Sequence, residues 1–164
     1  MPELDQHFLV DGKICAKMAK LLQIRSGETV LEIGAGTGRI SRQIAKKASV
    51  LAVESDHQLV VNFPKMRNVR VMEADGVKAL KQFKFDRVCG NLPFSILEPF
   101  FRELDRTEFK RGVFIVGGGF YQKLAGIAPG IKLESSEAVK KESFRPMPRK
   151  DAALVVVSRQ PSLA

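Results

Sequence analysis

Three closely spaced glycines at the end of a short apolar run constrain the fold more than any other feature of this sequence. The run covers residues 29–33 and enters the segment Gly34-Ala35-Gly36-Thr37-Gly38, after which apolar residues recur at helical spacing over residues 40–47. A strand, a glycine turn and a helix form the first unit of an open α/β sheet. Glycine has no Cβ, so such a turn lets the backbone come close to a ligand.

The rest of the chain continues this alternation of strands and helices. Short apolar runs predict further strands at residues 50–53, 69–72, 85–89, 113–116 and 152–157. Helical spacing predicts helices at residues 13–22 and 95–104. The pattern indicates an α/β class with a mostly parallel, Rossmann-like sheet and right-handed crossovers. The late strand is followed by no helix, and we expect it to insert antiparallel.

Length and composition fit one globular domain over residues 1–164. The chain is 45% hydrophobic and 27% charged. Its apolar runs fall short of the roughly 18 residues that span a membrane, and its start lacks a signal-peptide pattern. Cys15 and Cys89 have neither disulfide nor metal-ligand spacing. We therefore expect a cytoplasmic protein with no membrane partner and no metal.

The charge balance favours a polyanionic partner. Lys and Arg total 27 against 18 Asp and Glu, which leaves a net charge of +9. An excess of this size in a small domain is typical of proteins that bind RNA or DNA. A basic surface without a nucleic-acid target would have the same composition, so the charge alone leaves both interpretations open.

Acidic side chains follow the second and third predicted strands at the edge where such sheets bind ligands. Glu54 lies about twenty residues after Gly34, where a carboxylate accepts hydrogen bonds from a ribose diol. The glycine spacing is GxGxG, and it suits a ligand without a diphosphate. Asp75 could accept from the 6-amino group of an adenine, or it could cap the helix that starts at Gly76; the two roles are compatible.

The turn Asn91-Leu92-Pro93-Phe94 is the most specific element of the chain, and it follows the fourth strand beside the same crevice. Pro93 fixes its own φ and pushes Leu92 into an extended conformation. The Asn91 side-chain oxygen and the Leu92 carbonyl can then face one way and hold an exocyclic amine with two N–H donors. Phe94 offers a face on which a base can stack. The alternative is a proline turn whose Phe94 packs in the core.

An amine held by two acceptors suits methyl transfer. The lone pair of an adenine amine is delocalised into the ring, which makes it a poor nucleophile. Two acceptors hold the nitrogen nearer to tetrahedral, aim the lone pair at a sulfonium methyl and stabilise the positive charge that develops. The turn therefore indicates methylation of an adenine amine with S-adenosylmethionine as cofactor.

These motifs together resemble the ribosomal RNA adenine N6-dimethyltransferase family, which includes the erythromycin-resistance methylases. Gln6-His7-Phe8-Leu9 resembles its QNFL, residues 30–38 its cofactor loop, Asn91 to Phe94 its NLPY and Phe144-Arg145-Pro146-Met147-Pro148 its FxPxP. The resemblance implies a class I methyltransferase fold and ribosomal RNA, or a ribosomal subunit, as partner. It also implies that Phe144 stacks on the target adenine opposite Phe94, whereas the residue type alone, in a proline-rich loop, favours a core position for Phe144. The implied S-adenosylmethionine site comprises His7, Leu9, Gly34, Gly36, Glu54, Asp75 and Asn91.

The sequence departs from this family at several places. His7 replaces Asn, Phe94 replaces Tyr, and residues 117–119 are Gly-Gly-Gly where the family has Gln-Lys-Glu. Residues 128–143 are fewer than usual, so we expect a reduced sixth strand. The family's C-terminal helical domain and the basic segment before QNFL are expected to be absent. These departures affect recognition of the target more than binding of the cofactor.

Other functions stay open from the sequence alone. The fold could methylate DNA, protein or a small molecule, or it could serve as a catalytically degenerate RNA-binding or ribosome-assembly factor. A dinucleotide oxidoreductase is a further alternative, although nothing in that class requires the NLPF turn. For the RNA-directed interpretation we expect two basic rims beside the target pocket. One comprises Lys140, Lys141, Arg145, Arg149 and Lys150, and the other Arg102, Arg106, Lys110 and Arg111.

Overall fold

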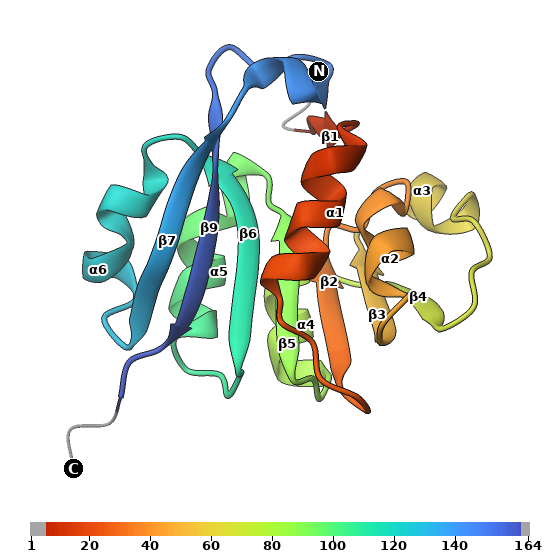
Figure 1. Ribbon diagram of the computed structural model, residues 1–164, viewed down its shortest axis with the longest axis horizontal. Helices are drawn as coiled ribbons and strands as arrows, with labels where there is room; N and C mark the ends of the chain where they lie inside the picture. Colours follow the sequence, from red (N-terminus) through yellow and green to blue (C-terminus); the bar gives the residue numbers. More distant parts are fainter. Residues whose placement is uncertain (1–5, 162–164) are drawn as a thin grey trace.

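Seven strands form a mixed sheet in the order β4-β3-β2-β5-β6-β9-β7 (Figure 1). The structure is a computed structural model that describes residues 6–161. Residues 1–5, where the sequence shows no signal-peptide pattern, and 162–164 lie outside the described part. The strands are β2 (Thr29–Ile33), β3 (Ser49–Glu54), β4 (Val69–Glu73), β5 (Arg87–Asn91), β6 (Arg111–Gly117), β7 (Ile131–Val139) and β9 (Ala152–Arg159).

The sheet has the parallel order and the antiparallel insertion that the sequence predicts. Strands β4, β3, β2, β5 and β6 pair in parallel, and β9 pairs antiparallel with both β6 and β7. The expectation of a reduced sixth strand is wrong. That strand is β7, whose nine residues pair along the whole of β9 with one β-bulge between Leu133 and Ser135. The strand is long because every residue of β9 offers it a backbone partner.

Helices cover both faces of the sheet, so the central strands are buried on both sides (Figure 1). Helices α1 (Gly12–Leu21) and α2 (Arg39–Ile44) pack on one face. Helices α4 (Gly76–Gln82), α5 (Leu97–Leu104) and α6 (Leu124–Ile127) pack on the other. The short α3 (His57–Val61) lies at the β3–β4 end.

A second, two-stranded sheet joins distant parts of the chain above the main sheet. Strand β1 (Phe8–Leu9) pairs antiparallel with β8 (Phe144–Arg145), and Leu9 lies opposite Phe144. The Val10 amide adds a hydrogen bond of 2.9 Å to the Ser143 carbonyl. This pairing brings the QHFL segment and the FRPMP segment together, which the spacing of the two segments along the chain does not predict.

The described residues contain no helix that is both long enough and apolar enough to cross a membrane. They also contain no cluster of three or more His, Cys, Asp or Glu side chains arranged to hold a metal ion. Cys15 and Cys89 are buried free thiols, and burial raises the pKa of the Cys15 thiol to about 11. These thiols are therefore core residues and poor nucleophiles.

Candidate cofactor and target-base site

A cavity of about 1060 Å³ lies at the carboxyl ends of the parallel strands. Ligands of open α/β sheets bind at this edge. Most of the predicted site residues line this cavity: His7, Gly34, Gly36, Glu54, Asp75, Asn91, Leu92, Pro93, Phe94 and Phe144. Leu9 instead lines a second pocket of about 30 Å³, which shares Gly34, Gly36 and Asn91 with the first.

The strand order explains why these residues meet. In the order β4-β3-β2-β5, the residues that end or follow each strand are Asp75, Glu54, Gly34 and Asn91. The carboxylates therefore lie on one side of the glycine turn and Asn91 lies on the other. The ends of β4, β3 and β5 each contribute one polar side chain, and the end of β2 contributes the glycine turn between them.

The glycine turn depends on backbone conformations that favour glycine. Gly34 and Gly36 have φ values of +69° and +56°. The Gly34 amide donates to the Val53 carbonyl at 2.8 Å, which ties the turn to the end of β3. A Cβ on Gly36 would lie 3.3 Å from the Phe8 ring. A side chain at either position would be strained, and at Gly36 it would also press on β1.

Glu54 holds the glycine turn and faces the cavity. Its side chain is 4% exposed, and its oxygens accept from the Gly36 amide and the Asp56 amide, both at 2.9 Å. A carboxylate has about four lone-pair sites, so these two bonds leave acceptor capacity for a ligand. Contact with a ribose diol stays a prediction for this residue.

Asp75 caps helix α4, which is one of the two roles that the sequence predicts for it. Its Oδ1 accepts from the amides of Val77 and Lys78, both at 2.9 Å. The other oxygen, Oδ2, takes no part in this cap, and Asp75 lines the cavity. The cap therefore orients the carboxylate without consuming it, and the predicted adenine contact remains compatible with the cap.

The Asn91 amide has a defined orientation. Its Nδ2 donates to the His7 carbonyl at 2.8 Å. A carbonyl can only accept, so the nitrogen of the Asn91 amide must face His7. The oxygen of that amide, Oδ1, therefore faces away from the His7 carbonyl. The Leu92 amide donates to the Ile115 carbonyl at 3.0 Å, which anchors the turn to β6. Pro93 has φ −64° and ψ 147°, and the 3-10 helix Phe94–Ile96 follows it.

His7 links the turn to the FRPMP segment. Its Nδ1 lies 2.7 Å from the Pro146 carbonyl, so Nδ1 must carry the proton and donate. Its backbone carbonyl accepts from Asn91. His7, which stands where the family has Asn, therefore connects two motifs. Its backbone carbonyl binds Asn91 of the NLPF turn, and its ring binds Pro146 of the FRPMP segment.

The two phenylalanines of the predicted stacking pair differ in exposure. Phe94 is 69% exposed, and a Cβ on Gly117 would lie 3.0 Å from its ring. Phe144 is 2% exposed and packs in the core on the α1–α2 side, although it also lines the cavity. Its interpretation as a core residue is thus compatible with the structure, and stacking on an adenine stays a prediction.

One of the two predicted basic rims reaches the cavity only in part, because Lys140, Lys141 and Arg145 do not line it. Arg149 and Lys150 line it, and so does Lys123, which belongs to no motif of the sequence. Lys123 ends the 3-10 helix Phe120–Lys123, and no pattern in the sequence associates that helix with the loop before β9. Lys123, Arg149 and Lys150 form a cationic side of the cavity, which we call the cationic rim.

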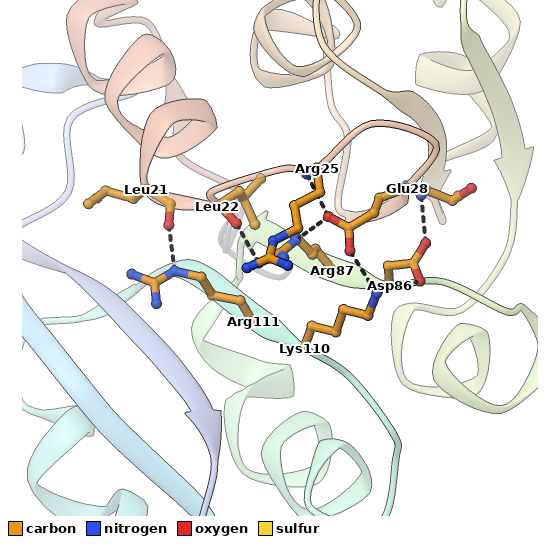
Figure 2. Close-up of polar contacts among 9 residues, drawn as sticks. Leu21, Leu22, Arg25, Glu28, Asp86, Arg87, Lys110 and Arg111 are labelled. Carbon is orange, nitrogen blue, oxygen red and sulfur yellow. Dashed lines mark hydrogen bonds and ion pairs between the residues drawn. The ribbon is translucent and has the colours of Figure 1, made fainter.

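The second predicted rim is wrong. Lys110 lies 3.0 Å from the Glu28 carboxylate, and Arg111 donates to the Leu21 carbonyl at 2.6 Å, at the start of β6 (Figure 2). These contacts lie at the amino ends of the parallel strands, whereas the cavity lies at their carboxyl ends. Helix α5 runs back along the sheet, so the residues that follow it return to the amino ends of the strands. Arg102, within α5, pairs with Glu98 at 2.7 Å, and neither Arg102 nor Arg106 lines the cavity.

A buried carboxyl lies behind the glycine turn. Glu32 is fully buried, the Ser41 hydroxyl donates to its Oε1, and Oε2 has no partner among the described residues. Burial chiefly, and the charge of Glu54 in addition, raise the pKa of Glu32 to about 8 despite the Ser41 hydrogen bond. Burial therefore favours the neutral, protonated form of Glu32 over the carboxylate. In the sequence it is simply one more residue of a predicted strand.

Comparison with known proteins decides the family. A family model described as "Ribosomal RNA adenine dimethylase" matches residues 2–164. The chain belongs to the ribosomal RNA adenine dimethylase family. The cofactor of this family is S-adenosylmethionine.

Relatives in this family include two named "Probable ribosomal RNA small subunit methyltransferase A". The one from Methanosarcina acetivorans is 33% identical over 96% of this chain and 65% of its own length. The one from Thermococcus sibiricus is 29% identical over 97% of this chain and 64% of its own length. The present chain thus spans a little under two thirds of the length of these family members.

The fold agrees with solved structures. A dimethyladenosine transferase from Plasmodium falciparum superposes with a TM-score of 0.81 at 24% identity. The superposition covers 94% of this chain and 64% of that one. At this identity the likeness concerns the fold, and it confirms the class I methyltransferase architecture with its antiparallel late strand.

Proposed function

We propose that this chain is a single catalytic domain that methylates the N6 amine of adenine in RNA, in the cytoplasm. Family membership supports the reaction class. The observation that carries the choice of an adenine amine is the orientation of Asn91, whose Nδ2 bond to the His7 carbonyl leaves Oδ1 as an acceptor beside the cavity.

The residues at the sheet edge fit S-adenosylmethionine. Gly34 and Gly36 form a backbone cradle that a Cβ would fill or strain, and Glu54 is a buried carboxylate with acceptor capacity left over. We assign Glu54 to the ribose and Asp75 to the adenine amine of the cofactor. His7, Leu9, Gly34, Gly36 and Asn91 would surround the remainder. When bound, the cofactor supplies an electrophilic sulfonium methyl.

The Asn91–Phe94 turn would hold the target adenine. Asn91 Oδ1 and the Leu92 carbonyl accept the two N–H groups of the amine, and the exposed Phe94 ring offers a stacking face. The two acceptors stabilise positive charge on the nitrogen as its bond to the methyl forms. Because both acceptors belong to a proline turn anchored to β6, little reorganisation is needed at that moment.

The cationic rim supports a nucleic-acid target. Lys123, Arg149 and Lys150 lie on the same cavity as the Phe94 ring, so a base at Phe94 would place its phosphates near these cations. An unpaired adenine costs the least to turn into such a cavity. We therefore propose RNA with exposed adenines as substrate, most simply ribosomal RNA or a ribosomal subunit.

The Asn91→Ala variant tests this proposal. Loss of one preorganised acceptor should lower methyl transfer by about 10²-fold at saturating cofactor. The measurement is transfer of labelled methyl groups to total RNA and to ribosomal subunits, followed by nucleoside analysis for N6-methylated adenosine. Asn62→Ala is the matched control, because Asn62 donates to the Gln58 carbonyl at the end of α3 and lies away from the cavity.

Two outcomes would contradict the proposal. Full activity of Asn91→Ala at saturating cofactor would exclude the turn from catalysis. Wild-type protein that binds RNA but transfers no methyl group to either substrate would support a catalytically degenerate RNA-binding factor instead.

A further inference from the structure

The charged side chains that α1, α2 and the chain between and after them expose are all basic. Between residues 12 and 53 every basic side chain is exposed, whereas both acidic side chains, Glu28 and Glu32, are buried. We call the exposed set the basic face: Lys13, Lys17, Lys20, Arg25, Arg39, Arg42, Lys46 and Lys47. This surface is separate from the cationic rim and includes none of its residues.

The spacing of these cations places them in two stripes. Lys13, Lys17 and Lys20 recur at intervals of four and three residues on α1, so they share one side of the helix. Arg39, Arg42 and Lys46 do the same on α2 and the turn after it. Seven helical residues rise about 10 Å, so each stripe is about that long.

Both stripes begin at the site described above. Helix α1 follows β1, which lines the cavity, and α2 follows the glycine turn, so that Arg39 lines the small pocket beside Gly34 and Gly36. The two helices pack against each other on the same face of the sheet (Figure 1). A ligand that reached into the cavity could therefore continue over the basic face.

Little of this charge is neutralised within the chain. Among the ion pairs of the described residues, one includes a member of the basic face, namely Lys17 with Glu137 at 2.7 Å. The opposite face is mixed in sign, because on it Lys81 pairs with Glu103 and Arg102 pairs with Glu98. Most of the charge on the basic face is therefore unpaired within the described chain, whereas the opposite face carries paired charges of both signs.

We propose that the basic face binds the phosphate backbone of an RNA duplex that flanks the methylated adenine. This inference rests on the proposed function, because it takes RNA as the substrate. Binding of single strands relies on aromatic stacking, and the large exposed apolar residues of the described chain (Val61, Phe94 and Met147) all lie outside α1 and α2. A lipid surface would also require apolar residues between the cations. Phosphates of a duplex, recognised by shape and charge, fit such a face.

Two variants with equal changes in net charge test the inference. The face variant carries Lys13→Gln, Lys20→Gln, Arg42→Gln and Lys46→Gln. The control variant carries Lys78→Gln, Lys81→Gln, Lys84→Gln and Arg102→Gln, all exposed residues outside the basic face and the cavity. Each protein is titrated, over a series of salt concentrations, with an RNA hairpin that has an adenine-containing loop and with the loop sequence alone. S-adenosylmethionine binding by calorimetry checks that both variants are folded.

The face variant should bind the hairpin about tenfold more weakly or worse at low salt. Its plot of log affinity against log salt should be shallower by about 0.7–0.9 for each phosphate that the variant no longer binds. The loop alone should bind as it does to wild type, and the control variant should stay within about twofold for both RNAs. Equally weakened binding in the two variants would show an effect of net charge alone and overturn the inference. So would unchanged hairpin affinity in the face variant, or wild-type binding to polyglutamate as tight as to the hairpin.

The result separates this inference from the proposed function. If wild type binds the hairpin through the basic face but no methyl group reaches an adenine, the RNA surface stands and the proposed catalysis fails. If the loop RNA is methylated and the face variant methylates the hairpin at subsaturating concentration as well as wild type does, the catalysis stands and the basic face is not a binding surface.

Discussion

At the scale of single residues, Gly117 lies against Phe94, the ring that we propose to stack on the target base. A Cβ there would lie 3.0 Å from Cδ2 of the exposed Phe94 ring. Gly117→Ala should therefore displace the ring and lower methyl transfer by about tenfold or more, since small misplacements of positioning groups have large effects on rate. Affinity for S-adenosylmethionine should not change. The measurement is single-turnover methylation together with cofactor calorimetry.

Gly119 provides the matched control for this change. A Cβ on Gly119 would meet nothing within 4 Å, and its φ of −100° suits alanine. Gly119→Ala should therefore retain activity. If Gly117→Ala and Gly119→Ala have the same rate, contact between residue 117 and Phe94 has no part in positioning the base.

Glu54 is the residue that decides cofactor affinity in our proposal. Glu54→Ala removes a charge-assisted acceptor for the ribose, worth roughly 1.5–3 kcal/mol, and should weaken S-adenosylmethionine binding by about tenfold or more. It also frees the Gly36 and Asp56 amides that the carboxylate holds. Glu54→Gln keeps one acceptor oxygen and should be intermediate. Unchanged affinity by calorimetry in a folded Glu54→Ala protein would refute the assignment.

At the scale of elements, Asp11 connects the start of α1 to the segment before β8. Its Oδ1 caps the helix through the Lys13 amide at 3.0 Å, and its Oδ2 accepts from the Ser143 hydroxyl at 3.0 Å. Asp11→Ala should lower the free energy of unfolding by about 1–2 kcal/mol. Asp11→Ser retains a capping oxygen and should recover part of that stability. Urea denaturation measures both.

Asp11→Ala should also destabilise the pairing of β1 with β8, because Asp11 binds Ser143 immediately before β8. Hydrogen exchange at β1 and β8 should increase in Asp11→Ala and stay low at the centre of β2. Uniform protection across all three strands would mean that Asp11 stabilises α1 alone.

At the scale of the whole molecule, a polar network connects the amino ends of the central strands, at the end of the sheet away from the cavity (Figure 2). Glu28 and Arg87 are both buried and lie 2.7 Å apart, and Arg87 also donates to the Leu22 carbonyl at the end of α1. Burial alone would raise the pKa of Glu28. Hydrogen bonds from Arg87, from the Arg25 amide and from Lys110 outweigh it and lower the pKa to about 2.

This network gives the stability of the protein a definite dependence on pH. The folded-state pKa of Glu28 lies below the usual value of 4.5, so its ionised form stabilises the fold above pH 4.5. That contribution is lost as the pH falls through about 2. Glu28→Gln leaves Arg87 buried with a weaker partner and should destabilise the protein by on the order of 3 kcal/mol at pH 7.

The measurement is the difference in unfolding free energy between Glu28→Gln and wild type from pH 7 to pH 2. It should be constant above pH 4.5 and shrink toward pH 2, because the wild type loses the charge that the variant lacks throughout. A difference that stays constant over this whole range would show that Glu28 titrates at its ordinary pKa.

The sequence by itself determined the class of the fold and the identity of most cavity residues. Local periodicity predicts every strand of the main sheet except β7, and the topology of parallel α/β units brings the ends of successive strands to one edge. The sequence therefore predicts that Glu54, Asp75 and Asn91 lie together, and all three line one cavity. The order of the motifs also identifies the family, because each motif is a continuous run of residues that can be recognised without the structure.

Tertiary structure alone decided which side chains outside those motifs reach the cavity. Lys123 does so because its 3-10 helix faces the loop before β9, and Lys110 and Arg111 do not because α5 carries the chain back to the other edge. The length of β7 depended on its partner β9, and the exposures of Phe94 and Phe144 depended on packing. Such properties arise from contacts between segments distant in sequence, on which local pattern carries no information.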